Sequence, residues 1–235
     1  VVVYVNGIPL AVFELKSPTS ESGTIRSAYL QLEGYKKDIA QLFKYNHLLV
    51  ISDLVKARYG TVGSAWDRFA IWKGLESEND DIKGMSELEV LVKGIFHKDR
   101  FLDTLRYFTV YEADSDGDSP KYTKKIAQYH QYYGVNKAVA ATTKAMKPSG
   151  NGKVGVFWHT QGSGKSLSMV FYVNKVKVLS ELKSPTFVFL TDRNDLDGQL
   201  HKTFLRTGYS HAWQATGIED LRKRLATPSG VVFTT

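Results

Sequence analysis

The 235-residue chain contains no cysteine, and no apolar run approaches the roughly 20 residues that a membrane-spanning helix requires. Without cysteine there can be no disulfide, no cysteine nucleophile and no cysteine-ligated metal, which fits a reducing compartment. The opening residues, VVVYVNGIPLAVFELKSP, follow a strand pattern rather than that of a secretory leader, so no signal peptide is expected. We therefore expect neither a membrane protein nor a disulfide-stabilised one.

Acidic residues are outnumbered: 31 Lys and Arg against 24 Asp and Glu give a net charge of +7. Such an excess suits a nucleic-acid partner, because neutralising phosphates supplies much of the binding free energy. A surface that is merely basic remains the alternative. The length is comfortable for two domains, and 43% hydrophobic residues can form a core in each.

The first half of the chain, residues 1–112, has the pattern of a mixed-sheet α/β domain. Two strand-like runs flank Asn6-Gly7, a pair that favours the tight turn of a β-hairpin. Apolar spacing then predicts further elements. These are a helix over 28–45, a buried strand over 47–53, and helices over 83–95 and 98–108.

The second half, residues 124–235, has the pattern of a parallel, doubly wound sheet. The acidic stretch at 113–123 is interrupted by glycine and proline and is predicted to be a linker. The elements predicted beyond it are helices over 122–146 and 166–182 and buried strands over 154–158, 186–192 and 230–235.

The stretch GVFWHTQGSGKSLSMVFYV places a glycine-rich turn between a predicted strand and a predicted helix. Gly162 and Gly164, followed by Lys165 and Ser166, are typical of a phosphate-binding loop, in which bare backbone amides and a helix N-terminus face an anion. The full pattern has a glycine where His159 stands here, so only its core matches. A glycine turn without a ligand is the alternative.

In the first half, the chemistry rests on FELK. Glu14 and Lys16 are two apart on a strand and therefore project from the same face. There a carboxylate can bind Mg²⁺ and a lysine can orient the attacking water, as in the second part of the PD-(D/E)xK nuclease signature. Glu and Lys also alternate on many solvated strands. A first metal carboxylate is missing, because no acidic residue precedes Glu14.

Gln41 and Tyr45 are four apart on the helix predicted over 28–45, so both would lie on one face. From there they could contact the DNA backbone or support Lys16. The alternative is an amphipathic helix that directs Leu42 and Phe43 into the core.

The chain resembles the restriction (motor) subunit of type I restriction-modification enzymes. The resemblance is carried, in order along nearly the whole chain, by VNGIPLAVFELKSP, QLFKYN, YHQYYGVNKAV, GVFWHTQGSGKSLSMVF, FVFLTDRNDLDGQL and VVFTT. It implies a PD-(D/E)xK endonuclease domain joined to the first part of a RecA-like lobe of a superfamily 2 motor. Such a motor pumps double-stranded DNA with ATP and Mg²⁺, in the cytoplasm of a bacterium or archaeon.

On the nuclease side, the resemblance makes Glu14 the second metal carboxylate and Lys16 the lysine of the triad. It makes Gln41 and Tyr45 the family's Q-x-x-x-Y pair. In relatives the first metal carboxylate, an aspartate, directly precedes the strand that begins here at Val1. The chain is therefore expected to start one residue after it.

On the motor side, Gln131 resembles the glutamine that reads adenine, a role for which its amide can both donate and accept. Lys165 would contact the β- and γ-phosphates and Ser166 would bind Mg²⁺. Asp192 and Arg193 correspond to a segment that touches DNA. The other phosphate-loop candidates are Thr160, Gly162, Ser163 and Gly164. Without the resemblance, Gln131 is a solvated helix residue and Arg193 forms a helix-start ion pair.

The resemblance also implies partners, namely the methyltransferase and specificity subunits of the restriction complex. The acidic box and the second lobe that ATP hydrolysis needs cannot be placed before Thr235, so this stretch alone is expected to be inactive. Two other functions stay open. One is a helicase or remodelling ATPase with an inactive nuclease-like domain that binds DNA, and the other is a docking module for the methyltransferase core.

Overall fold

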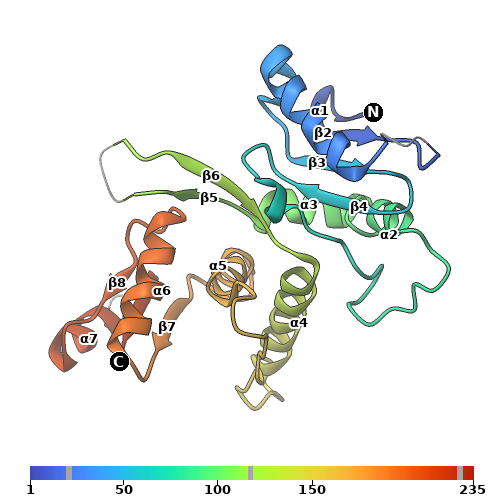
Figure 1. Ribbon diagram of the computed structural model, residues 1–235. Helices are drawn as coiled ribbons and strands as arrows, with labels where there is room; N and C mark the ends of the chain where they lie inside the picture. The colour runs from blue at the N-terminus through green and yellow to red at the C-terminus, as the bar shows by residue number, and fades with distance from the viewer. Residues whose placement is uncertain (20–22, 116–118, 227–229) are drawn as a thin grey trace. The chain divides into compact units, whose positions relative to one another are not determined.

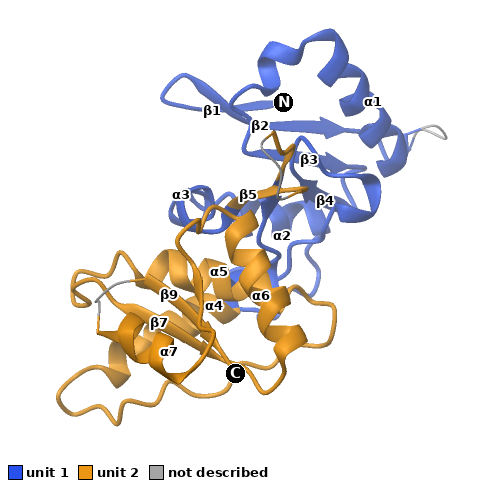
Figure 2. Cartoon of the chain, turned by 90° about the vertical axis from the view of Figure 1, so that its left-hand side faces the viewer, with its two compact units in different colours: residues 1–109, 124–133 blue, residues 110–123, 134–235 orange. Residues whose placement is uncertain are grey.

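The chain folds as an α/β protein whose computed structural model describes residues 1–19, 23–115, 119–226 and 230–235. Its residues group into two compact units, shown in different colours in Figure 2. Unit 1 comprises residues 1–109 and 124–133, and unit 2 comprises residues 110–123 and 134–235. Because α4 (Tyr129–Ala145) begins in unit 1 and ends in unit 2, it carries the chain from one to the other.

Unit 1 is built on a four-stranded mixed sheet in the order β1-β2-β3-β4 (Figure 1). Its strands are β1 (Val2–Val5), β2 (Ile8–Leu15), β3 (Leu48–Ser52) and β4 (Ala57–Gly60). The β2–β3 pair is parallel and the two outer pairs are antiparallel. Asn6 and Gly7 join β1 to β2 with φ angles of 50° and 80°, the left-handed conformation that the Asn-Gly pair favours. The predicted hairpin is confirmed.

Unit 1 contains three α-helices and two 3₁₀ helices among the described residues, and the first two α-helices begin at polar caps. The helices are α1 (Ile25–Asp38), the short 3₁₀ helices η1 (Ala40–Phe43) and η2 (Trp66–Arg68), α2 (Glu87–Gly94) and α3 (Lys98–Tyr107). Thr24 and Ser27 form a capping box at the start of α1, and Ser86 caps α2 through the Glu89 amide. The helices predicted over 83–95 and 98–108 are therefore confirmed as α2 and α3.

The single helix predicted over 28–45 is wrong in its second part. α1 ends at Asp38, since Ile39 leaves the helical conformation (φ −130°, ψ 50°). A 3₁₀ turn then directs Phe43 into the core, beside Leu32 and Leu49. Tertiary packing of Phe43 thus replaces the last turns that the apolar spacing predicts.

The segment predicted as a linker, 113–123, contains the end of one strand and the start of another. β5 (Thr109–Ala113) and β6 (Tyr122–Ile126) pair in a two-stranded sheet, and residues 116–118 between them lie outside the described residues. The helix predicted over 122–146 is wrong at its start, because residues 122–126 form β6 and α4 begins at Tyr129.

Unit 2 contains a parallel three-stranded sheet in the order β7-β9-β8. Its strands are β7 (Thr186–Leu190), β8 (Trp213–Gln214) and β9 (Gly230–Thr234). Its helices are α5 (Lys165–Val176), α6 (Asn194–Arg206) and α7 (Ile218–Leu225), together with the rest of α4. Parallel strands that alternate with helices confirm the predicted RecA-like fold class.

The strand predicted over 154–158 is not observed. These residues have no regular structure, and Val156 is 97% exposed. A parallel strand needs a neighbour to pair its backbone groups, and no strand of the described sheet is hydrogen-bonded to this segment. The helix predicted over 166–182 also ends early, at Val176.

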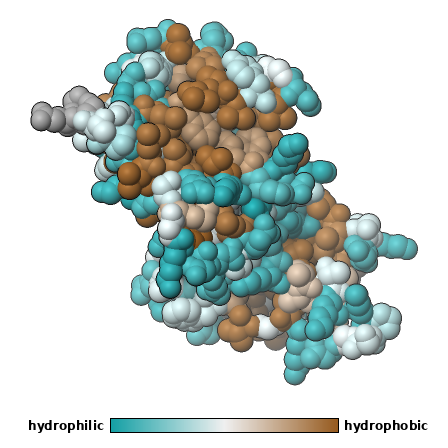
Figure 3. Space-filling view, turned by 90° about the vertical axis from the view of Figure 1, so that its right-hand side faces the viewer, coloured by the Kyte–Doolittle hydropathy of each residue, from teal (hydrophilic) through white to brown (hydrophobic). Residues whose placement is uncertain are grey.

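The surface is not uniformly charged despite the net charge of +7. Apolar side chains gather over the upper part of the face shown in Figure 3, at the height of α1 and β1–β3 in Figure 1. Among the described residues, no helix is both long and apolar enough to cross a membrane. The face in Figure 3 therefore carries an apolar area beside its hydrophilic ones.

Candidate functional site

Glu14 and Lys16 lie together where β2 ends. β2 runs parallel to β3, with Leu15 opposite Ser52, and the Lys16 amide donates to the Ser52 carbonyl at 2.8 Å. The Lys16 ammonium nitrogen lies 2.8 Å from Glu14 Oε1, and the two side chains are only 22% and 14% exposed. The predicted shared location is thus observed, at the carboxyl end of a parallel pair, where α/β sheets commonly bind ligands.

Gln31 of α1 completes this cluster. Lys16 Nζ donates to Gln31 Oε1, and Gln31 Nε2 donates to the Tyr35 hydroxyl. Gln31 and Tyr35 are four residues apart and therefore lie on one face of α1. An amide that accepts at one end and donates at the other fixes its own orientation and, with it, the position of the lysine. Lys16 is consequently held by a carboxylate and by an amide.

The sequence reasoning placed the Q-x-x-x-Y pair elsewhere, on Gln41 and Tyr45. In the structure Gln41 belongs to the 3₁₀ helix η1, while Tyr45 lies beyond it and is 59% exposed. They do not share a helix face, so the geometric basis of that prediction is wrong. The sequence QLEGY at 31–35 has the same spacing, and its position on α1 was the signal that was missed.

A divalent metal would find only part of its ligand set here. Glu14 supplies a carboxylate, and Mg²⁺ prefers oxygen ligands of this kind. Among the described residues, no group of three or more His, Cys, Asp or Glu side chains is placed to hold a metal ion. The cluster therefore supplies one carboxylate ligand of a Mg²⁺ site, with Lys16 beside it.

The glycine-rich turn forms an open loop before α5. Gly162 and Gly164 have φ angles of 79° and 77°, a region that favours glycine, and Gly164 occupies the N-cap position of α5. No side chain caps this end of the helix, so its first amides are available to an anion. The loop thus has the backbone features of a phosphate site.

Lys165 folds back across this loop. Its ammonium donates to the carbonyl oxygens of His159 and Thr160 at 2.9 and 3.0 Å. Ser163 Oγ donates to the Thr160 carbonyl at 2.7 Å and closes the turn from its other end. Because an ammonium has three donors, one remains for a phosphate oxygen. Ser166 follows as the second residue of α5.

Gln131 is not the solvated helix residue that its position alone suggested. It is only 4% exposed, and its Oε1 accepts from the Gln128 amide at 2.9 Å, at the start of α4. Gln131 belongs to unit 1. A role in reading adenine stays a prediction.

At the start of α6, Arg193 and Asp195 form a bidentate ion pair with distances of 3.0 and 2.6 Å. The hydrogen bonds from Arg193 lower the pKa of the Asp195 carboxyl. Asp192 is exposed beside them. The helix-start ion pair weighed from the sequence is therefore present, and DNA contact by Asp192 and Arg193 stays a prediction.

A buried carboxylate on the same helix was missed by sequence reasoning. Asp197 is 2% exposed, and its Oδ2 accepts from Gln214 Nε2 at 2.6 Å. This bond links α6 to β8, an edge strand of the parallel sheet. No local pattern signals it, because Asp197 and Gln214 are far apart in sequence.

Two family models match the chain. Residues 1–68 match the N terminus of type I restriction enzyme R proteins, and residues 130–235 match the SWI2/SNF2 ATPase model. The HindI endonuclease subunit of Haemophilus influenzae is 49% identical over 87% of this chain and 19% of its own length. The putative MjaIXP endonuclease subunit of Methanocaldococcus jannaschii is 37% identical over 100% of the chain and 23% of its own length. Both relatives are named as type I restriction enzyme subunits.

Fold and matches together define an α/β protein in which a restriction-type N-terminal domain precedes a SWI2/SNF2-type ATPase lobe. The chain belongs to the family of type I restriction enzyme R subunits, as the resemblance in its sequence predicted. It spans about a fifth of the length of the curated relatives it matches.

Proposed function

We propose that this chain carries the endonuclease site and the ATP-binding lobe of a DNA-translocating type I restriction enzyme. In this proposal the motor brings duplex DNA to the nuclease, which hydrolyses a phosphodiester bond with Mg²⁺. The observation that carries the nuclease part is the Glu14–Lys16–Gln31 cluster at the end of β2.

In the nuclease, Glu14 would hold Mg²⁺ together with a second carboxylate, which the PD-(D/E)xK signature places on the strand paired with β2. The antiparallel register supports this arrangement, because Val1 lies opposite Phe13, the neighbour of Glu14. When bound, Mg²⁺ polarises the scissile phosphate and lowers the pKa of its water. Lys16, held by Gln31, would then donate to a phosphate oxygen and stabilise the charge that develops there. Gln41 and Tyr45 remain candidates only for contact with the DNA backbone.

In the motor, the loop from Thr160 to Gly164 would surround the phosphates of ATP with backbone amides. Lys165 would move one or more of its hydrogen bonds from the loop carbonyls to the β- and γ-phosphates, and Ser166 would reach Mg²⁺. The uncapped N-terminus of α5 supports this assignment, since its positive end faces the loop. Gln131 would read the adenine, and Asp192 and Arg193 would contact DNA.

Two substitutions in the assembled enzyme separate the halves. Glu14→Gln should abolish DNA cleavage and leave ATP hydrolysis and translocation nearly intact, because the carboxylate serves only the metal at the scissile phosphate. Lys165→Ala should abolish all three, because no DNA is then delivered to the nuclease. One plasmid substrate reports the outcome through ATPase rate, triplex displacement and loss of supercoiled DNA. Loss of ATP hydrolysis in Glu14→Gln would overturn the nuclease assignment.

The alternative function is a remodelling ATPase whose nuclease-like domain only binds DNA. Mg²⁺-dependent nicking by the full-length subunit would exclude it, provided that the nicking disappears in Glu14→Gln. The methyltransferase and specificity subunits are the proposed protein partners, by analogy with the type I enzymes that the relatives' names describe. Tight binding to those subunits, with cleavage unaffected in the Lys16 and Lys165 variants, would instead favour a docking module.

A further inference from the structure

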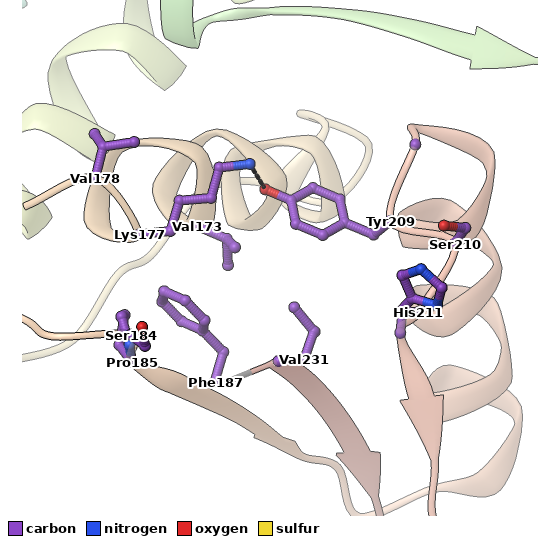
Figure 4. A pocket seen from close by; sticks show the side chains of 13 residues that line it. Val173, Lys177, Val178, Ser184, Pro185, Phe187, Tyr209, Ser210, His211 and Val231 are labelled. Carbon is purple, nitrogen blue, oxygen red and sulfur yellow. Dashed lines mark hydrogen bonds between the residues drawn. The ribbon is translucent and has the colours of Figure 1, made fainter. Parts of the chain in front are cut away.

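Unit 2 contains a cavity of about 500 Å³ that none of the candidate sites above uses. Its walls are the C-terminal end of α5, the start of β7 with the two residues before it, the start of β9, and the 208–212 loop after α6 (Figure 4). In Figure 4 the side chains of Val173, Phe187 and Val231 face the space, while Lys177 and Tyr209 meet across its upper side. The size and the apolar walls are those of a small-molecule site.

The polar groups of this cavity are few and lie at its rim. Lys177 Nζ donates to the Tyr209 hydroxyl at 3.2 Å, and that hydroxyl donates to Asn174 Oδ1 at 2.5 Å. His211 lies at the right of the space in Figure 4, below Tyr209 and Ser210. None of the thirteen lining residues is acidic. The rim is therefore basic, and a negative charge would meet an ammonium without an opposing carboxylate.

Lys177 is an exposed residue whose ammonium lies against the Tyr209 side chain. Partial burial of this ammonium lowers its pKa, because the charged group is less well solvated than in bulk water. Its nitrogen also lies 4.8 Å from the centre of the Tyr209 ring. An anion beside Lys177 would compensate for the lost solvation, whereas the tyrosine hydroxyl is its only hydrogen-bond acceptor among the bonds described here.

The corners of the cavity are set by unusual backbone conformations. Ser184, Gly208 and Gly230 all have positive φ angles, of 57°, 98° and 136°. For Ser184 this conformation is strained, because its side chain crowds the backbone. Ser184 lies in the connection before β7, Gly208 lies in the loop after α6, and Gly230 is the first residue of β9, so all three line the opening.

We propose that this cavity binds a small amphipathic anion. Its aromatic or branched aliphatic body packs against Phe187 and Val231, and its carboxylate or sulfonate lies beside Lys177 and His211. The site is separate from the phosphate loop, because Val173 and Lys177 lie two to three turns along α5 from Lys165, about 12 to 18 Å away. A single helix thus lines the proposed nucleotide site at one end and this cavity at the other.

Isothermal titration of the complete chain with 2-naphthoate tests the proposal, with the neutral naphthalene-2-methanol as the matched probe. We expect saturable binding of the carboxylate, about tenfold weaker in Lys177→Met, and no more than a twofold change for the alcohol. Lys183→Met is the control, because this lysine is exposed and lies outside the cavity. Val178→Trp, at the exposed rim, should block both probes in a variant that still unfolds cooperatively.

Several results would overturn the proposal. These are absence of saturable binding, equal affinity in Lys177→Met and the unmodified chain, or undiminished binding in Val178→Trp. The same titration on a full-length R subunit tests whether another part of the protein, rather than a small molecule, fills the cavity. Binding there supports the small-molecule site. A subunit that binds neither probe would show that protein covers the cavity, and the assignment would fail.

Discussion

Gln31→Leu provides the sharpest test of the nuclease site, because structure and sequence reasoning point to different glutamines. Leucine keeps the approximate size of the side chain but can neither accept from Lys16 nor donate to Tyr35. Lys16 would then keep only its pair with Glu14, at 2.8 Å. The substitution leaves the Lys16 ammonium in place as a group but removes the hydrogen bond that positions it.

The expected size of the effect follows from the bond that is lost. A hydrogen bond to a charged group contributes about 1.5–3 kcal/mol, and this pair is mostly shielded from solvent. If that free energy holds the lysine in its productive position, its loss slows cleavage about 10- to 100-fold. ATP hydrolysis should not change, because the phosphate loop does not use this residue.

The assay is loss of supercoiled plasmid by the assembled enzyme, with the ATPase rate measured in the same reaction. Gln41→Leu is the matched comparison and should slow cleavage far less than Gln31→Leu, because Gln41 is exposed on η1 and its proposed role is a single contact with the DNA backbone. Because Gln31 acts through Lys16, its substitution should have almost no further effect in a Lys16→Met background. A further tenfold loss there, or a Gln41→Leu variant as slow as Gln31→Leu, would refute the reasoning.

Two further predictions concern other parts of the chain. Gly134→Ala raises helix propensity, but its Cβ would lie 2.8 Å from Phe157, a residue of the segment before the phosphate loop. Because this contact would displace the segment that leads into the phosphate loop, ATP affinity should fall about tenfold. Gly198→Ala is the control and should leave ATP affinity unchanged, because no atom lies within 4 Å of its added Cβ. Equal ATP affinities of the two variants in nucleotide titrations would contradict this prediction. Burial lowers the pKa of His47 from 6.5 to about 3, so folding requires the neutral ring. The free energy of unfolding is therefore unaffected by His47 above about pH 6.5 and falls as the pH drops toward 3, by about 3 kcal/mol at pH 4.5. Denaturant unfolding should show a flatter pH dependence in His47→Gln.

Local patterns were sufficient wherever neighbouring residues decide the conformation. Asn6-Gly7 set the hairpin through its left-handed φ angles, and the spacing of Glu14 and Lys16 placed both side chains together. The glycines of the phosphate loop were likewise evident, since Gly162 and Gly164 adopt conformations that other residues rarely do. The family was also readable, because its motifs are contiguous stretches of sequence.

Local patterns gave wrong predictions where residues distant in the sequence determine the local conformation. The run at 154–158 is apolar enough for a buried strand, but strand formation depends on a hydrogen-bonding neighbour that periodicity does not reveal. The helix predicted through Tyr45 ended at Asp38, since Phe43 had to enter the core.

The sequence by itself determined the fold class, the family, the hairpin with its Glu-x-Lys pair, and the glycine loop, because each depends on residues within a few positions of one another. Only the tertiary structure decided which glutamine supports Lys16, since QLEGY and QLFKY have the same spacing and only α1 brings Gln31 to the end of β2. It also decided that Asp197 bonds Gln214 and that a basic-rimmed cavity forms behind α5. These features join segments that the chain separates by 15 or more residues, and packing alone brings such segments into contact.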